Sequence, residues 1–312
     1  MALQIIGRMT PFSRKEFLKT TAMAAGALAI APGYKTPRAV IAMSFSTLGC
    51  PGWPFDKIVE FAVANGYRGI EIRGIQREMD LTKCKEFSPG ARAATMQLMK
   101  DNDLVFVNLG SSANLHTLEP VERKKNLDEA RRFIDLAHEI NCPFIRVFPN
   151  NLPVDRDRQA TLELIAQGLL ELGEYARDSK VAVLMETHGD LVRSEDILNV
   201  MNRASHPNTG LVYDICNMWS VTKERPVDVV KKLKKFIRHT HFKDAKIVDG
   251  KPQYVLTGKG EVPIRDAMLA LVMSGSYTGF IGFEWEKLWH PEIEEPEIAI
   301  ADFPKAMEKL FQ

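Results

Sequence analysis

Four acidic or imidazole side chains stand near the carboxyl ends of four short segments that are rich in β-branched and aromatic residues. They are Glu186, Asp214, His241 and Glu284. Because side chains alternate between the two faces of a strand, these four are expected to lie opposite the apolar residues of their segments. Three buried carboxylates would lose their hydration at a high cost, which a divalent cation removes, and the cation also explains the imidazole. Any one of the four alone is more typical of a helix cap or a surface charge, but we interpret the set as ligands of one divalent metal ion.

Two further polar residues of the same segments have competing interpretations. His188 shares the strand face of Glu186, and it either contacts a substrate hydroxyl or forms a hydrogen bond at the rim. Lys243 either stabilises an oxyanion or pairs with Asp244 or Glu284, and pairing is the favoured interpretation. Both residues are therefore candidates for substrate binding.

Arg146 and Glu71 are also candidates for substrate contact, although a structural bridge between buried charges is favoured for both. His239 is interpreted as a hydrogen-bonded core histidine, and Glu286 as a charge at the rim. The expected metal site combines oxygen ligands with one nitrogen. Such a site suits Mn²⁺, Mg²⁺, Co²⁺ or Zn²⁺ and does not by itself choose among them.

The segments that carry these residues belong to a regular alternation of short strands and longer helices. The expected strands are 40–45, 69–72, 105–108, 144–148, 181–186, 210–214, 237–243 and 279–285. The expected helices lie near 54–65, 89–101, 120–140, 155–179, 194–202, 226–233, 263–274 and 294–310. Eight such pairs close most economically into a (β/α)₈ TIM barrel, and the competing doubly wound sheet lacks its GxGxxG after the first strand. We predict one barrel domain over residues 38–312, with its reactive groups at the carboxyl ends of the strands.

Composition and charge narrow the class of ligand. The chain has 312 residues, with 41 Lys and Arg against 40 Asp and Glu, which gives a formal net charge of +1. This balance argues against a nucleic-acid partner, because binding phosphates requires a cationic surface. The four cysteines include no CxxC pair and are too few for a disulfide scaffold. A small-molecule enzyme or binding protein is therefore expected, and a homo-oligomer is compatible with the sequence.

The first 31 residues have the order of an export signal. Arg14 and Lys15 precede an uncharged, alanine-rich run over 20–30. The order resembles a bacterial twin-arginine signal in which Lys15 replaces the second arginine, and the run is shorter than the about 20 residues of a membrane span. We expect a periplasmic mature protein that begins near Ala31 and is not inserted in the membrane. If the segment is only a disordered extension, the protein stays in the cytoplasm.

Five segments carry a resemblance to a known family, from about Ala39 to the end of the chain. They are 66–71 (GYRGIE), 185–189 (METHG), 212–214 (VYD), 241–244 (HFKD) and 279–284 (GFIGFE). In this order they resemble the xylose isomerase-like TIM barrel superfamily, and within it the sugar phosphate isomerase/epimerase group of ketose 3-epimerases and inosose-processing enzymes. The resemblance implies that Glu186, Asp214, His241 and Glu284 hold one divalent metal, commonly Mn²⁺. It also implies that Glu186 and Glu284 exchange protons with the substrate carbon.

Two positions depart from the pattern of the epimerases. Many epimerases have a substrate-binding histidine three residues after the metal-binding aspartate, where this chain has Asn217. In the loop 258–261, Lys259 stands where relatives often have an acidic residue. Both departures bear on the substrate and the reaction type, whereas the expected metal ligands are unaffected.

Proton abstraction beside a carbonyl is the chemistry that best fits the expected ring of ligands. The metal would stabilise an enediolate while one glutamate removes the proton and the other returns it. We therefore expect an isomerase or epimerase of sugars or related polyols. The main alternative is a metal-dependent lyase or hydratase acting on a keto-sugar or keto-glycoside, which starts with the same step. A sugar-binding barrel without activity is a weaker alternative.

Overall fold

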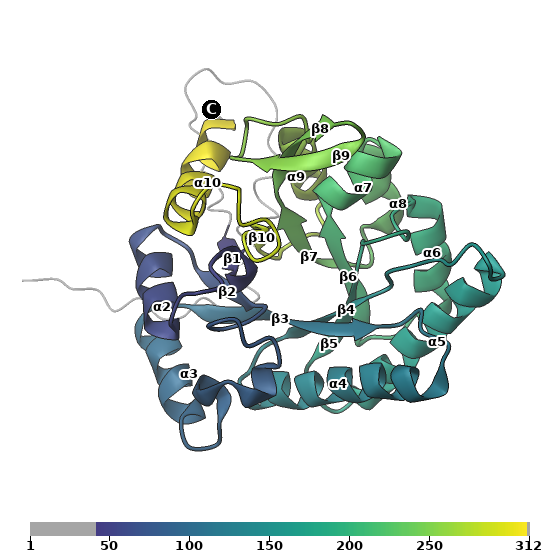
Figure 1. Ribbon diagram of the computed structural model, residues 1–312, viewed down its shortest axis with the longest axis horizontal. Helices are drawn as coiled ribbons and strands as arrows, with labels where there is room; N and C mark the ends of the chain where they lie inside the picture. The colour runs from purple at the N-terminus through teal and green to yellow at the C-terminus, as the bar shows by residue number, and fades with distance from the viewer. Residues whose placement is uncertain (1–41, 311–312) are drawn as a thin grey trace, which may run out of the picture. The chain divides into compact units, whose positions relative to one another are not determined.

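Eight parallel strands close into a barrel (Figure 1). The computed structural model describes residues 42–310. The strands follow one another around the barrel in chain order, and the last pairs with the first. They are β1 Met43–Ser46, β2 Gly69–Ile72, β3 Val105–Asn114, β4 Phe144–Phe148, β5 Ala182–Glu186, β6 Thr209–Asp214, β7 Ile237–Phe242 and β10 Ile281–Phe283. The predicted TIM-barrel fold is confirmed.

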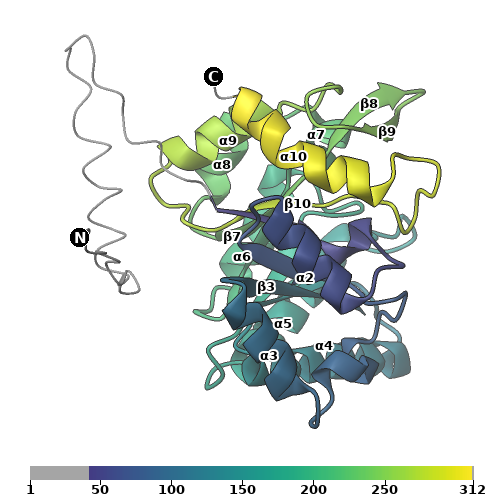
Figure 2. The same cartoon turned by 90° about the vertical axis from the view of Figure 1, so that its left-hand side faces the viewer.

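Helices follow the strands and cover the outside of the barrel (Figures 1 and 2). The α-helices are α2 Phe55–Ala64, α3 Arg92–Asp101, α4 Pro120–Glu139, α5 Arg158–Tyr175, α6 Ser194–Arg203, α7 Ile215–Thr222, α8 Pro226–Leu233, α9 Ile264–Met273 and α10 Pro296–Leu310. Three short 3₁₀ helices are η1 Thr47–Gly49, η2 Leu81–Lys83 and η3 Lys85–Phe87. The predicted helices agree with these bounds to within a few residues, except that α7 was not predicted.

The extra helix α7 begins directly where β6 ends. Asp214, the last residue of β6, caps the helix, because its Oδ1 accepts the backbone N–H of Asn217 at 2.7 Å. Side-chain acceptors at a helix N-terminus satisfy N–H groups that have no partner inside the helix. One carboxylate oxygen of Asp214 is therefore used for capping, and its other oxygen, Oδ2, lies on the side of the barrel interior, near His241.

An antiparallel hairpin, also not predicted, follows β7. It consists of β8 Asp244–Val248 and β9 Lys251–Val255. The two turn residues, Asp249 and Gly250, both have positive φ values, 49° and 76°. An Asp-Gly pair is typical of such a two-residue turn, so the sequence did contain a signal for the hairpin.

The predicted signal segment, 1–31, and its cleavage point at Ala31 lie outside the described residues. Within 42–310, no helix combines the length and the hydropathy that crossing a membrane requires. All four cysteines, Cys50, Cys84, Cys142 and Cys216, are buried and unpaired in this part of the chain.

Candidate metal centre

The barrel brings the four expected metal ligands together. Glu186, Asp214, His241 and Glu284 are all buried, and one candidate ligand atom from each lies within 4.8 Å of the others. The Nδ1 atom of His241 is 3.2 Å from Glu284 Oε1 and 3.4 Å from Glu186 Oε1. Asp214 Oδ2 lies 4.0 Å from the same nitrogen. The four side chains thus surround one small volume at the carboxyl ends of β5, β6, β7 and β10.

Strand register explains why these residues converge. Asp214 pairs with His241 across β6 and β7, and His241 pairs with Gly282, two residues before Glu284. A side chain at Gly282 has no room, because its Cβ would lie 2.4 Å from the carbonyl oxygen of Thr240. Glycine therefore allows β10 to approach β7 closely, and side-chain alternation then directs Glu284 to the same face as His241.

Two polar atoms of the ring lack hydrogen bonds. Among the described residues, His241 Nδ1 and Glu186 Oε2 have no hydrogen-bond partner, although both are buried. Buried polar atoms are almost always hydrogen-bonded, so a nitrogen that faces three carboxylates without a hydrogen bond requires an explanation. A divalent cation shared by these groups would supply it, and three carboxylates with one imidazole fit Mn²⁺, Mg²⁺, Co²⁺ or Zn²⁺. The residues present therefore fit a divalent ion but do not fix its identity.

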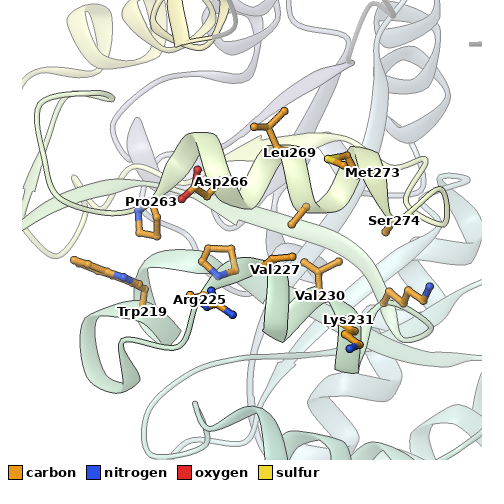
Figure 3. Close-up of a pocket in the computed structure, with 13 residues that line it drawn as sticks. Trp219, Arg225, Val227, Val230, Lys231, Pro263, Asp266, Leu269, Met273 and Ser274 are labelled. Carbon is orange, nitrogen blue, oxygen red and sulfur yellow. The ribbon is translucent and has the colours of Figure 1, made fainter. Parts of the chain in front are cut away.

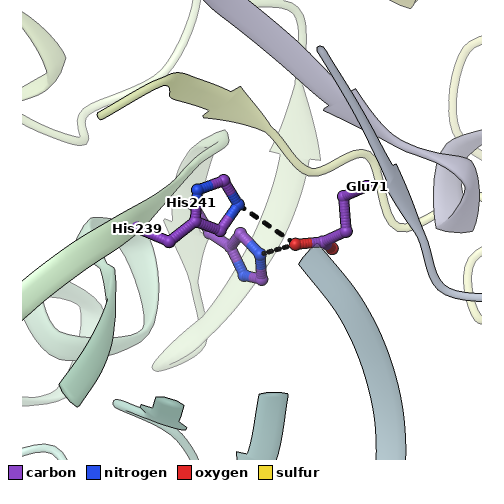
Figure 4. Close-up of side chains that lie close together, drawn as sticks. All are labelled: Glu71, His239 and His241. Carbon is purple, nitrogen blue, oxygen red and sulfur yellow. Dashed lines mark hydrogen bonds and ion pairs between the residues drawn. The ribbon is translucent and has the colours of Figure 1, made fainter. Parts of the chain in front are cut away.

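Glu71, from β2, holds the far side of the His241 ring (Figure 4). Its Oε2 is 2.9 Å from His241 Nε2 and 3.1 Å from His239 Nε2, and it also accepts the amide of Asn108 at 2.8 Å. An ionised carboxylate only accepts hydrogen bonds, so both Nε2 atoms carry hydrogen. In the neutral form of His241, Nδ1 then has a lone pair that points toward the other three metal ligands. Glu71 is thus a bridge between two histidines, which was the favoured interpretation, and the hydrogen-bonded state expected for His239 is confirmed.

Lys243 compensates part of the negative charge of the ring. Its buried ammonium group lies 2.6 Å from Asp214 Oδ2 and 2.8 Å from Glu286 Oε1, and it also contacts Glu284 Oε2. The sequence predicted pairing with Asp244 or Glu284, and among the described residues the partner is Glu284. The Asp244 carboxylate instead accepts backbone N–H groups of the loop that follows the hairpin, from Gly258, Gly260 and Val262. The side chain of Glu286 is 13% exposed, as a rim charge should be.

Arg146 and Arg73 bring further positive charge to the barrel interior. Arg146 Nη1 lies 3.2 Å from Glu186 Oε2, so the expected bridge to a barrel carboxylate is present. Arg73 was not predicted; it is buried and donates to the Gly110 carbonyl at 3.3 Å and to Ser112 Oγ at 2.9 Å. Burial and the neighbouring Arg146 together lower the pKa of Arg73 to about 9, against the opposing effect of carboxylates that include Glu186. Contact of Arg146 or Glu71 with a substrate remains a prediction.

The charges of the ring shift the pKa values of its members in different directions. Burial and Glu284 raise the pKa of Glu186, but Arg146 and His241 outweigh them and bring it to about 2. Burial raises the pKa of Asp214 to about 7 despite the neighbouring Lys243. Burial lowers the pKa of His241, but Glu284, Glu71 and Glu186 together hold it well above its ordinary value. Asp214 and His241 are thus the two ligands that must release protons before they can bind a cation at neutral pH.

His188 and Asn217 lie next to the ring. The Nδ1 atom of His188 is 2.8 Å from Asn150 Oδ1, and its ring lies on Phe148 with 4.6 Å between the ring centroids. The Asn217 amide donates to the Thr187 carbonyl at 3.4 Å. No sequence signal pointed to Asn150, because its role depends on a contact between two separate loops. Substrate contact by His188 or Asn217 stays a prediction.

A separate cavity lies on the outside of the barrel, between α8 and α9 (Figure 3). Its walls include Val227, Val230, Leu269 and Met273, and Arg225 and Lys231 contribute positive charge. None of the candidate metal ligands lines it. The chemistry expected from the sequence therefore lies inside the barrel, away from this cavity.

Comparison with known proteins gives both family and fold. The sequence profile described as xylose isomerase-like TIM barrel matches residues 59–306. The uncharacterized protein YihM of Escherichia coli (strain K12) is 25% identical over 225 residues, which are 70% of this chain and 62% of that protein. The 3-dehydroshikimate dehydratase of Bacillus anthracis is 24% identical over 198 residues, 62% of this chain and 68% of that enzyme. The chain therefore matches less than two thirds of the length of the first of these relatives.

Solved structures share the fold at low sequence identity. The IOLI protein, solved with a bound zinc atom, has a TM-score of 0.73 and 15% identity over 86% of this chain and 98% of that one. The probable 3-DHS dehydratase AsbF of Bacillus anthracis has a TM-score of 0.69 and 18% identity over 86% of this chain and 99% of that one. A D-tagatose 3-epimerase-like protein has a TM-score of 0.68 and 18% identity over 87% of this chain and 98% of that one. At these identities the likeness shows the fold alone.

Proposed function

Because the chain belongs to the xylose isomerase-like TIM barrel family, we propose that it is a divalent-metal-dependent enzyme that removes a proton beside the carbonyl of a keto-sugar or related polyol. Isomerisation or epimerisation is the reaction that we propose first. The observation that carries the proposal is the ring of Glu186, Asp214, His241 and Glu284, in which the buried His241 Nδ1 faces three carboxylates without a hydrogen bond. A site for binding neutral sugars alone would not require this concentration of buried carboxylates.

A divalent cation held by the four residues would act as a Lewis acid and polarise the substrate carbonyl, with Mn²⁺ as our first choice. Glu186 ends β5 and Glu284 directly follows β10, and these two strands are separated in the barrel by β6 and β7. Burial raises the pKa values of both carboxyl groups, but His241 together with Arg146 at Glu186 and Lys243 at Glu284 outweighs it and lowers them, so both are ionised at neutral pH and able to accept a proton. One glutamate removes the proton from the α-carbon, and the other returns a proton to the opposite face or to the adjacent carbon.

Lys243 and Arg146 would act beside this pair of glutamates. The Lys243 ammonium contacts Glu284, and the Arg146 guanidinium contacts Glu186, so each glutamate has its own cationic partner. These partners hold the two carboxylates in place, because a buried ion pair with good geometry restricts both side chains. We expect His188 to contact a hydroxyl group of the substrate.

Two observations favour a second candidate, a dehydratase of a keto-sugar or cyclic keto-acid. The first is Asn217, at the position where ketose 3-epimerases carry histidine. The second is the likeness to a 3-dehydroshikimate dehydratase. In this reaction a glutamate takes the α-proton, the hydroxyl group on the neighbouring carbon leaves with a proton as water, and a carbon–carbon double bond forms. The first step is the same as in epimerisation, so the ring serves both reactions.

Deuterium exchange tests the proposal and separates the two reactions. Enzyme loaded with Mn²⁺ in D₂O is mixed with D-tagatose, D-fructose or 3-dehydroshikimate, and the products are analysed by mass spectrometry and proton NMR. Epimerisation or isomerisation places deuterium on a carbon next to the carbonyl, whereas dehydration gives a product lighter by one water. Glu284→Gln and Glu186→Gln should each lower turnover by about 10²-fold or more, while Glu78→Gln on an exposed turn should not. A substrate that turns over without loss of its α-proton would refute the proposed chemistry.

A further inference from the structure

His188 is held on two sides but leaves one ring nitrogen without a partner. Its ring lies on Phe148, which in turn lies 3.7 Å from the Arg146 guanidinium, and its Nδ1 is 2.8 Å from Asn150 Oδ1. Within residues 42–310, no hydrogen bond involves its Nε2, and this atom is not among the fully enclosed ones. His188 follows Glu186 by two residues at the end of β5, and the charges of Glu186, Lys243 and Glu284 act on its side chain, so His188 lies beside the metal ligands.

The hydrogen bonds behind His188 have a single possible direction. The chain of contacts starts at the Ser112 carbonyl, which can only accept, so the Asn114 Nδ2 donates to it, at 2.9 Å. The Asn114 Oδ1 is then the atom that faces Asn150, and it accepts a hydrogen bond from Asn150 Nδ2. Asn150 therefore turns its Oδ1 toward His188, and an amide oxygen has no hydrogen to give. The Nδ1 of His188 must carry the hydrogen.

The backbone conformation around Asn150 stabilises the hydrogen bond between Asn150 and His188. Asn150 and Gly189 both have left-handed backbone conformations, with φ values of 46° and 63°. Gly189 packs against Asn150 so closely that a Cβ would lie 2.8 Å from the Asn150 carbonyl oxygen. That same oxygen accepts the Asp190 N–H at 3.0 Å. A non-glycine residue in this region costs about 1 kcal/mol or more, and such positions cluster at functional sites.

We propose that Asn114 and Asn150 are positioning residues that fix the hydrogen of His188 on Nδ1, so that Nε2 faces the substrate as a hydrogen-bond acceptor. The identity of the group that Nε2 meets rests on the proposed function. A nitrogen that accepts hydrogen bonds, as Nε2 of His188 then does, recognises O–H groups and not carbonyl oxygens. The substrate therefore carries a free hydroxyl group on the carbon atom that lies next to the end of β5. Neither asparagine touches the substrate; both act through His188.

Nitrogen-15 NMR tests the relay directly and needs no substrate. In the full-length, Mg²⁺-loaded protein, at a pH where His188 is neutral, His188 Nδ1 should show the shift of a protonated nitrogen and Nε2 that of an unprotonated one, assigned with the His188→Gln variant. In Asn114→Leu, Asn150 loses its donor contact and its amide is free to flip, so the Nε2–H form of His188 should appear although residue 114 does not touch it. Asn65→Ala, which removes a comparable side-chain contact at the end of α2, should leave the tautomer unchanged. Wild-type His188 with its hydrogen on Nε2, or no change in Asn114→Leu, would overturn the proposal.

Kinetics separate this proposal from the proposed function. Once a substrate is found, Asn150→Ala should lower kcat/KM by roughly 2- to 10-fold, the value of one hydrogen bond, with the metal content unchanged. An analogue that lacks the hydroxyl near β5 should show no difference between wild type and Asn150→Ala. Equal losses with substrate and analogue would contradict the role of Nε2 as a hydroxyl acceptor. If no sugar or keto-acid turns over at all, the proposed function fails, and the tautomer measurement still decides the relay.

Discussion

Replacing Glu71 by glutamine should weaken metal binding without contact between residue 71 and the ion. The carboxylate accepts a hydrogen bond from His241 Nε2 at 2.9 Å, and glutamine keeps an oxygen at this distance but loses the charge. A hydrogen bond to a charged group contributes about 1.5–3 kcal/mol and a neutral one about 0.5–1.5 kcal/mol, so the loss is about 1–2 kcal/mol. This corresponds to a dissociation constant that is roughly 5- to 30-fold weaker, near the about 10- to 100-fold range for groups that orient metal ligands.

The same substitution should lower thermal stability. Glu71 Oε1 has no hydrogen-bond partner among the described residues, so a glutamine that places its NH₂ group there buries an unsatisfied donor. Such a donor costs about 1–3 kcal/mol. The loss should be seen as a lower denaturant midpoint in the presence of a chelator, where metal binding does not contribute.

Isothermal titration calorimetry with Mn²⁺, together with circular dichroism to confirm folding, measures both effects. Glu86→Gln is the matched control. Glu86 is a buried glutamate, 9% exposed, and it belongs neither to the metal-ligand set nor to the group that Glu71 forms with His239 and His241. A folded Glu71→Gln protein that binds Mn²⁺ within about twofold of wild type would refute the reasoning, because His241 would then be oriented without its carboxylate partner.

Three other outcomes are expected. Metal affinity should rise as the pH rises through about 7, because burial raises the pKa of Asp214 to about 7 and nearby carboxylates raise the pKa of His241 despite its burial, so both must lose protons before they bind. Calorimetry in buffers of different ionisation enthalpy should record the released protons, and a pH-independent affinity would contradict this. Lys243→Met should lower the free energy of unfolding by about 3–5 kcal/mol in the presence of a chelator, since three carboxylates lose a shared cation. Added Mn²⁺ should recover part of this loss. The control Lys246→Met, at an exposed lysine, should leave the stability unchanged. We also propose export to the periplasm, so N-terminal sequencing of protein from its native host should find a start near Ala31, and an intact Met1 in a cytoplasmic fraction would contradict it.

The sequence was sufficient for the barrel and for the convergence of the ring. Each of Glu186, Asp214 and His241 stands at or near the end of a strand whose apolar residues show the alternation, and parallel strands of a barrel place these ends together. The helix α7 was missed because the helix-cap alternative for Asp214 was set aside once the four residues were interpreted as ligands of one metal ion, although an aspartate followed by a helix-forming run is typical of a cap. The hairpin β8–β9 was missed because the alternation of strand and helix left no place for it, despite its Asp249-Gly250 turn.

Contacts across the barrel lay beyond the sequence. Glu71 and His241 are separated by 170 residues, and Asn114 and Asn150 by 36. Alternation assigns each side chain to the inner or outer face of its strand, but it does not say which inward side chains meet. The sequence likewise did not show which carboxylate pairs with Lys243. Only the structure distinguishes Asp244 from the carboxylates of the metal ligands as its partner.

Elemental analysis of dialysed protein is the most direct test of the metal centre. Wild-type protein that was purified without chelator should hold about one divalent ion per chain, and His241→Ala should hold much less, because it removes the nitrogen ligand that faces all three carboxylates. His206 is a partly exposed histidine that belongs neither to the metal-ligand set nor to the group of Glu71, His239 and His241, so His206→Ala should keep the metal content of the wild type. An ion content in His241→Ala equal to that of wild type would contradict the assignment of Glu186, Asp214, His241 and Glu284 as one metal site.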